Sequence, residues 1–78
     1  MKLRDHLTSL DGKPDKTGKE CRRIAKAIRS TPYYVYMLAL EHKSAGHALA
    51  IAIENATSFA VTRSDLRPDI WAPDKEAA

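Results

Sequence analysis

Residues 21–38 read CRRIAKAIRSTPYYVYML, and this stretch decides the fold because it has the pattern of two short helices joined by a tight turn. Before the turn, apolar side chains recur at helical spacing and basic side chains fill the other positions. The apolar positions are Cys21, Ile24, Ala25 and Ile28. This pattern predicts a helix over about residues 19–28.

Ser30 and Thr31, directly in front of Pro32, predict the start of the second helix of the stretch. A hydroxyl side chain can cap unpaired backbone N–H groups, and proline is favoured in the first helical turn, where no N–H is needed. We therefore expect a helix over about residues 32–42, with Val35, Leu38 and Ala39 on its inner face. Two helices joined by a three- or four-residue turn match a helix-turn-helix motif.

Outside this stretch the sequence predicts three more short helices. Leu3, Leu7 and Leu10 fall on one face of a helix over about residues 2–10, and an apolar run predicts another over about residues 47–56. Thr62 and Asp65 have the spacing of a capping box, which predicts a short turn ending at Pro68. Residues 11–18 contain two glycines, a proline and charges without periodicity, and are expected to form a loop. The fold class predicted is all-α.

The charge distribution of the chain is compatible with a polyanionic partner. Thirteen Lys and Arg residues against ten Asp and Glu residues give a net charge of +3, and the acidic residues gather towards the ends of the chain. This asymmetry favours a polyanion, although a solvated lysine-rich face explains it equally well. The single cysteine excludes an internal disulfide, and no apolar stretch reaches membrane-spanning length. We expect a cytoplasmic protein with no membrane association.

The sequence contains no motif for catalysis, a metal or a cofactor. No serine, cysteine or carboxylate lies in a recognisable nucleophile or acid-base motif, and no glycine-rich phosphate loop is present. The closest pair of histidines, His42 and His47, has a spacing that turns the two side chains to different sides of a helix, and Cys21 has no partner cysteine. The chain is not expected to be an enzyme.

Two segments carry a family resemblance: RRIAKAI with TPYYVYML, and the ending ALAIAIENATSFAVTRSDLRPDIW. Together they resemble the Cro-type and YdaS-type helix-turn-helix regulators of phages and prophages over about residues 19–72. The resemblance implies a five-helix, lambda-repressor-like (Cro/CI-type) domain, which we expect over residues 1–72. The polar residues 73–78 are expected to form a flexible tail. It also implies a repressor-like transcriptional regulator that binds double-stranded operator DNA as a homodimer.

The resemblance also implies roles for individual residues. The helix over about 32–42 would enter the major groove, and its groove-facing side would include Pro32 and the base-contact candidates Thr31, Tyr33, Tyr36 and Met37. Basic and polar side chains around it would contact phosphates without reading sequence. These phosphate-contact candidates are Lys19, Arg23, Lys26, Arg29, Lys43 and Ser44.

Some features depart from the family pattern. Arg29 stands where a glycine commonly permits a left-handed turn, and Tyr36 and Met37 replace the small polar and glutamine-like residues that usually contact bases.

Three interpretations stay open or are weighed against an alternative. The tyrosine-rich helix could instead bind a protein, as in an antitoxin or an anti-repressor. Trp71 is interpreted as a lid over the core in preference to part of a dimer seam. The role of residues 11–18 stays open between a DNA contact and a tolerated insertion.

Overall fold

The computed structural model describes residues 1–71, and all regular structure among them is helical. Five short helices follow one another: α1 (Leu3–Asp11), α2 (Lys19–Ala27), α3 (Pro32–Ala39), α4 (His47–Ala56) and α5 (Arg63–Leu66). The predicted all-α fold class with five short helices is therefore confirmed for this part of the chain. The predicted tail over 73–78 lies outside the described residues.

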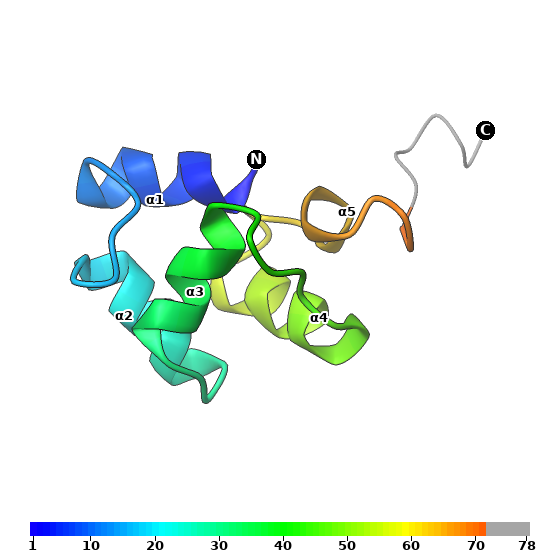
Figure 1. The fold of residues 1–78 in the computed structure, drawn as a ribbon. Coiled ribbons are helices and arrows are strands. Elements are labelled where there is room, and N and C mark those ends of the chain that lie inside the picture. Colours follow the sequence, from blue (N-terminus) through cyan, green and yellow to red (C-terminus); the bar gives the residue numbers. More distant parts are fainter. Residues whose placement is uncertain (72–78) are drawn as a thin grey trace.

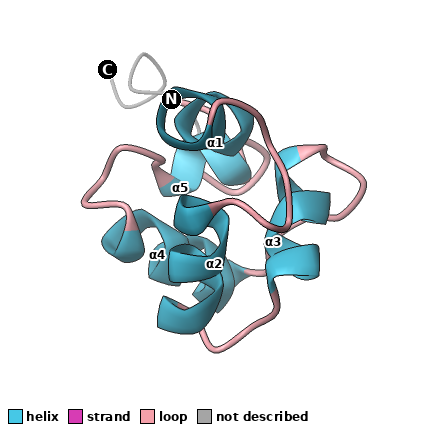
Figure 2. Ribbon diagram, turned by 90° about the vertical axis from the view of Figure 1, so that its left-hand side faces the viewer, coloured by secondary structure: helices cyan, strands magenta, loops and turns pink. Residues whose placement is uncertain are grey.

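Helix α2 occupies the middle of the fold. It packs most extensively against α3 and also contacts α1 and α4, while α1 contacts α3 and α4 contacts α5 (Figure 1). Figure 2 shows the same helices turned by 90°, with loops as the only connections between them. The helices enclose one small core, whose largest fully buried side chains are Leu7, Cys21, Ile24, Val35, Ile53 and Val61.

The α2–α3 pair forms as its local sequence predicts. Residues 28–31 connect the two helices, and the side chain of Thr31 accepts a hydrogen bond from the backbone N–H of Tyr34 at 3.2 Å. Pro32 is the first residue of α3. The arrangement is compatible with a small helix-turn-helix domain.

Three of the helices end in the same way, with a residue other than glycine in the left-handed conformation. Arg29 (φ 58°), Glu41 (φ 63°) and Ser58 (φ 52°) each follow the C-cap of α2, α3 and α4. In each case the backbone N–H groups of this residue and of the next one donate to carbonyl oxygens in the last turn of the helix. At the end of α2, for example, the N–H of Arg29 bonds to the carbonyl of Lys26 at 3.2 Å, and the N–H of Ser30 bonds to that of Ala25 at 2.8 Å. This is the Schellman pattern, for which glycine is the usual residue.

The Schellman ending explains why α3 is shorter than predicted. The backbone N–H of Glu41 bonds to the carbonyl of Leu38, and that of His42 bonds to the carbonyl of Met37. These bonds close the helix, so that α3 ends at Ala39 and not near His42. No glycine marks this end in the sequence.

The prediction that Leu10 lies on the buried face of α1 is wrong. Leu3 and Leu7 are buried, but Leu10 is 60% exposed and the third buried residue of the helix is His6. The spacing places Leu10 on the same angular face, so its exposure means that the last turn of α1 extends past the edge of the core.

Asp11, in the last turn of α1, caps the start of α2. Its two carboxylate oxygens accept the backbone N–H groups of Glu20 and Cys21, at 3.0 and 3.2 Å. Gly18 is required beside it, since a Cβ atom at residue 18 would collide with the Asp11 carboxylate. Gly18 is the N-cap residue of α2 and has no side chain that could cap the helix, so Asp11 caps it instead.

The end of the described chain is tied to α4. Arg63 donates from its side chain to the buried carboxylate of Glu54 at 2.8 and 2.9 Å, and its backbone N–H also bonds to Glu54. Trp71 packs against the core, its ring 4.9 Å from that of His47 and beneath the guanidinium of Arg63. This position fits the interpretation of Trp71 as a lid.

Candidate nucleic-acid interface

The structure separates the three tyrosines of α3 into different environments. Tyr33 is 52% exposed, whereas Tyr34 and Tyr36 are half-buried and pack against the core. Thr31 is exposed at the start of the helix, and Pro32 and Met37 are half-buried. Among the predicted base-contact residues, Thr31 and Tyr33 therefore offer the most accessible surface, both at the N-terminal end of α3.

One hydrogen bond joins the first turns of α2 and α3 directly. The thiol of Cys21 donates a hydrogen bond to the carbonyl oxygen of Pro32 at 3.3 Å. Cys21 is two residues from the start of α2, and Pro32 is the first residue of α3. The first turn of α2, with exposed Lys19, therefore lies beside the first turn of α3.

Several of the predicted phosphate-contact residues are exposed cations on α2 or in the turn that follows it. Lys19 and Lys26 lie on α2, Arg29 lies in the turn before α3, and all three side chains are exposed. Within residues 1–71 none of them forms an ion pair. Their charges are therefore not neutralised by an acidic side chain of the described residues.

Arg23 differs from the other cations because its side chain is already engaged. Its Nε and Nη2 atoms donate to the Glu20 carboxylate at 2.6 Å, and Nη2 also donates to the carbonyl of Ala56 at 2.9 Å. Glu20 is buried, and its second contact is His6 Nε2, also at 2.6 Å. The Arg23 hydrogen bonds hold the pKa of the Glu20 carboxyl below its usual value, while burial opposes them. Arg23 thus joins α2 to α4.

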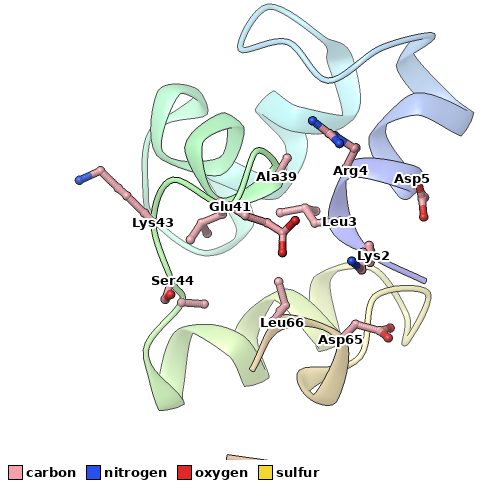
Figure 3. A pocket seen from close by; sticks show the side chains of 12 residues that line it. Lys2, Leu3, Arg4, Asp5, Ala39, Glu41, Lys43, Ser44, Asp65 and Leu66 are labelled. Carbon is pink, nitrogen blue, oxygen red and sulfur yellow. The ribbon is translucent and has the colours of Figure 1, made fainter. Parts of the chain in front are cut away.

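Lys43 and Ser44 lie at the other end of α3 from Thr31 and Tyr33. They line a pocket between the start of α1, the α3–α4 connection and α5 (Figure 3). In Figure 3 the Lys43 side chain points away from this pocket, and the Glu41 carboxylate points into it between Leu3 and Leu66. Any phosphate bound by Lys43 would therefore be separate from one bound at the start of α3.

Sequence reasoning did not single out Lys16. Its ammonium nitrogen lies 5.9 Å from the centroid of the Tyr33 ring, so the loop before α2 reaches the start of α3. Nothing in the local sequence signals this proximity, because the two residues belong to different segments.

The described residues contain neither a cluster of metal ligands nor a helix of membrane-spanning character. Across residues 1–71 no cluster of three His, Cys, Asp or Glu side chains could hold a metal ion. No helix in the same span has both the length and the apolarity needed to cross a membrane.

Comparison with known proteins gives two findings. The family described as "Bacterial toxin YdaS" matches residues 17–74, which include α2, α3, α4 and α5. A relative from Escherichia coli (strain K12), named "Prophage transcriptional regulatory protein", is 40% identical over 58 residues, covering 74% of this chain and 88% of the relative. That name does not describe an enzyme. No solved structure matches the chain. Because the family match covers most of the chain and agrees with this relative, the chain belongs to the YdaS family.

Proposed function

We propose that this protein is a sequence-specific DNA-binding transcriptional regulator, a Cro-like repressor of a phage or prophage. Helix α3 enters the major groove, where Thr31, Tyr33, Tyr36 and Met37 face the bases. The observation that carries the proposal is the exposed first turn of α3 with cations on α2 and in the turn before it. The relative named as a prophage transcriptional regulatory protein supports the same function.

The phosphate contacts would come from both ends of α3. Lys19, Lys26 and Arg29 serve the α2–α3 side, and Lys43 and Ser44 serve the α3–α4 connection. Arg23 could contribute only the part of its guanidinium that Glu20 and Ala56 leave accessible. Because such contacts release counterions, six of them per dimer would give a slope of roughly −5 for log K against log salt.

A homodimer on operator DNA belongs to the same proposal. One α3 of eight residues contacts only a few base pairs, and a two-fold pair of such helices reads two half-sites about one helical turn apart. The domain over residues 1–72 would then be the DNA-binding unit.

The test is a fluorescence-anisotropy titration with DNA flanking the gene of this protein and with a scrambled duplex of equal length. Each duplex is titrated at about 50 and about 200 mM salt, because phosphate contacts make affinity salt-dependent. We expect tight, salt-sensitive binding that favours the flanking DNA. No binding to either duplex at the lower salt would contradict the proposal.

The second candidate function is binding to a protein, as an antitoxin or anti-repressor does. The toxin description of the family and the exposed rings of Tyr33 and Phe59 favour it. Met37 and Leu40 are both half-buried, so their exposure favours neither candidate. Failure of the DNA titration would make this candidate the preferred one.

A further inference from the structure

The segment over residues 12–18, whose role the sequence leaves open, has a defined shape. The carboxylate of Asp15 accepts the backbone N–H of Thr17 at 3.1 Å, and the backbone N–H of Gly18 bonds to the carbonyl of Asp15 at 3.0 Å. These bonds form a tight turn with Lys16 at its tip, and the Lys16 side chain is exposed.

The turn is fixed relative to α3 by contacts on both of its sides. Asp11, before it, caps the first turn of α2, and Cys21, after it, bonds to Pro32. These contacts hold the two ends of the segment close to α2 and to the first turn of α3. Its ammonium nitrogen lies 5.9 Å from the centroid of the Tyr33 ring, at the outer limit of a cation–π contact.

Charge distinguishes Lys16 from the other lysine of the segment. The ammonium nitrogen of Lys13 lies 3.9 Å from the Asp15 carboxylate, whereas Lys16 forms no ion pair within residues 1–71. An ammonium group beside an aromatic ring keeps N–H donors directed to solvent, because it has three of them and the ring accepts through its face. Lys16 can therefore bind an anion while it stays beside Tyr33.

We propose that Lys16 is a DNA-phosphate contact held beside the first turn of α3 by Tyr33, which makes the 12–18 segment a further DNA-binding element of the proposed surface. This inference rests on the proposed function. The phosphate belongs to a nucleotide next to the base that Tyr33 faces, so the segment is part of the binding surface and not a tolerated insertion. Holding the lysine in place also reduces the side-chain entropy lost on binding.

The first experiment compares wild type, Lys16→Gln and Lys13→Gln in the anisotropy titration. Both variants remove one charge from the same exposed segment, but only Lys16 lies beside Tyr33. For Lys16→Gln we expect the slope of log K against log salt concentration to become shallower by about 0.9 per bound chain. The affinity advantage of wild type over Lys16→Gln should then shrink about three- to fourfold between about 50 and about 200 mM salt. Lys13→Gln should change the slope less.

The second experiment tests the role of Tyr33 with a double-mutant cycle of Lys16→Gln and Tyr33→Leu. Once the ring is absent, Lys16→Gln should weaken DNA binding by about two- to fivefold less than it does in wild type, as expected for a cation–π contact at an exposed site. Circular dichroism of each variant checks that the helices are retained.

The possible results separate this inference from the proposed function. If wild type binds DNA and Lys16→Gln keeps the wild-type affinity and slope, the inference alone is overturned. Equal effects of Lys13→Gln and Lys16→Gln, or additive effects in the cycle, would overturn the positioning by Tyr33. If wild type binds neither duplex, the proposed function fails and this inference fails with it.

Discussion

The thiol of Cys21 donates to the carbonyl oxygen of Pro32 across 3.3 Å, and this contact ties the buried face of α2 to the first turn of α3. Cys21 is fully buried, as are Ile24 and Val35 in the same core. The position of α3 on α2 is therefore set from inside the molecule. The exposed face of α3 can carry unusual residues such as Tyr33 without changing how the two helices pack.

Burial should make Cys21 unreactive in the folded protein. Desolvation, reinforced by the charges of Asp11 and Asp15, raises the pKa of the thiol from 9.0 to about 11. Two pKa units lower the thiolate fraction near pH 8 about a hundredfold. Alkylation by iodoacetamide, followed by mass spectrometry, should therefore be at least about a hundredfold slower in the native protein than in guanidinium chloride. Equal rates in the two conditions would show that the thiol is accessible.

Arg29→Gly should stabilise the fold and weaken DNA binding at the same time. Arg29 adopts a left-handed conformation that glycine adopts without a Cβ penalty, so the free energy of unfolding should rise by about 1 kcal/mol. Losing the guanidinium should reduce affinity for any DNA sequence and make the salt slope shallower by about 0.9 per bound chain. Chemical denaturation and anisotropy measure the two effects.

Ser58→Gly is the matched control for this change. Ser58 ends α4 with the same backbone geometry but carries no charge. It should therefore show a similar gain in stability with unchanged DNA affinity. If Arg29→Gly binds DNA as tightly as Ser58→Gly does, Arg29 makes no phosphate contact.

Tyr33→Ala and Lys43→Ala should separate base reading from phosphate binding. A side chain that contacts bases contributes about 1–3 kcal/mol of discrimination, so Tyr33→Ala should lower affinity for operator DNA about tenfold or more and affect scrambled DNA less. Lys43→Ala should weaken both complexes alike. Tyr36 is tested as Tyr36→Phe, because its ring packs against the core and alanine would also destabilise the fold. Parallel losses from Tyr33→Ala and Lys43→Ala on both DNAs would contradict the assigned roles.

Glu20→Gln should reduce the acid sensitivity of the fold. Hydrogen bonds from Arg23, and a smaller contribution from His6, lower the pKa of the Glu20 carboxyl in the folded state. A lowered folded-state pKa adds stability above the unfolded-state pKa, and that stability is lost as the pH falls through the folded-state value. Between about pH 5 and about pH 3 the unfolding free energy of wild type should therefore fall more steeply than that of Glu20→Gln.

Asp69→Asn is the control for the acid experiment. Asp69 pairs with Arg67, but its side chain is 63% exposed, so solvent screens the pair. This variant should follow the wild-type pH dependence more closely than Glu20→Gln does. If the unfolding free energy of Glu20→Gln depends on pH as that of wild type does, the ion pair of Glu20 contributes nothing to the acid sensitivity of the fold.

Local signals in the sequence determined where two helices begin. Thr31 and Pro32 start α3, and the side chains of Thr62 and Asp65 form the predicted capping box at α5. The inner faces of α2 and α3 were also predictable, because buried Ile24 and Val35 follow helical spacing. These features depend on partners within one or two turns, which a single sequence displays directly.

Contacts between segments were decided only by the tertiary structure. Asp11 caps α2 from 9 and 10 residues away, Arg23 reaches a carbonyl 33 residues away, and Lys16 meets Tyr33 across the α1–α2 connection. The left-handed conformation of Glu41, which ends α3, likewise could not be predicted, because the residue there is not glycine. Helical periodicity determines which face of a helix is apolar, but only the packing of the helices determines which distant polar groups meet, and therefore which cations are already engaged by other groups of the protein.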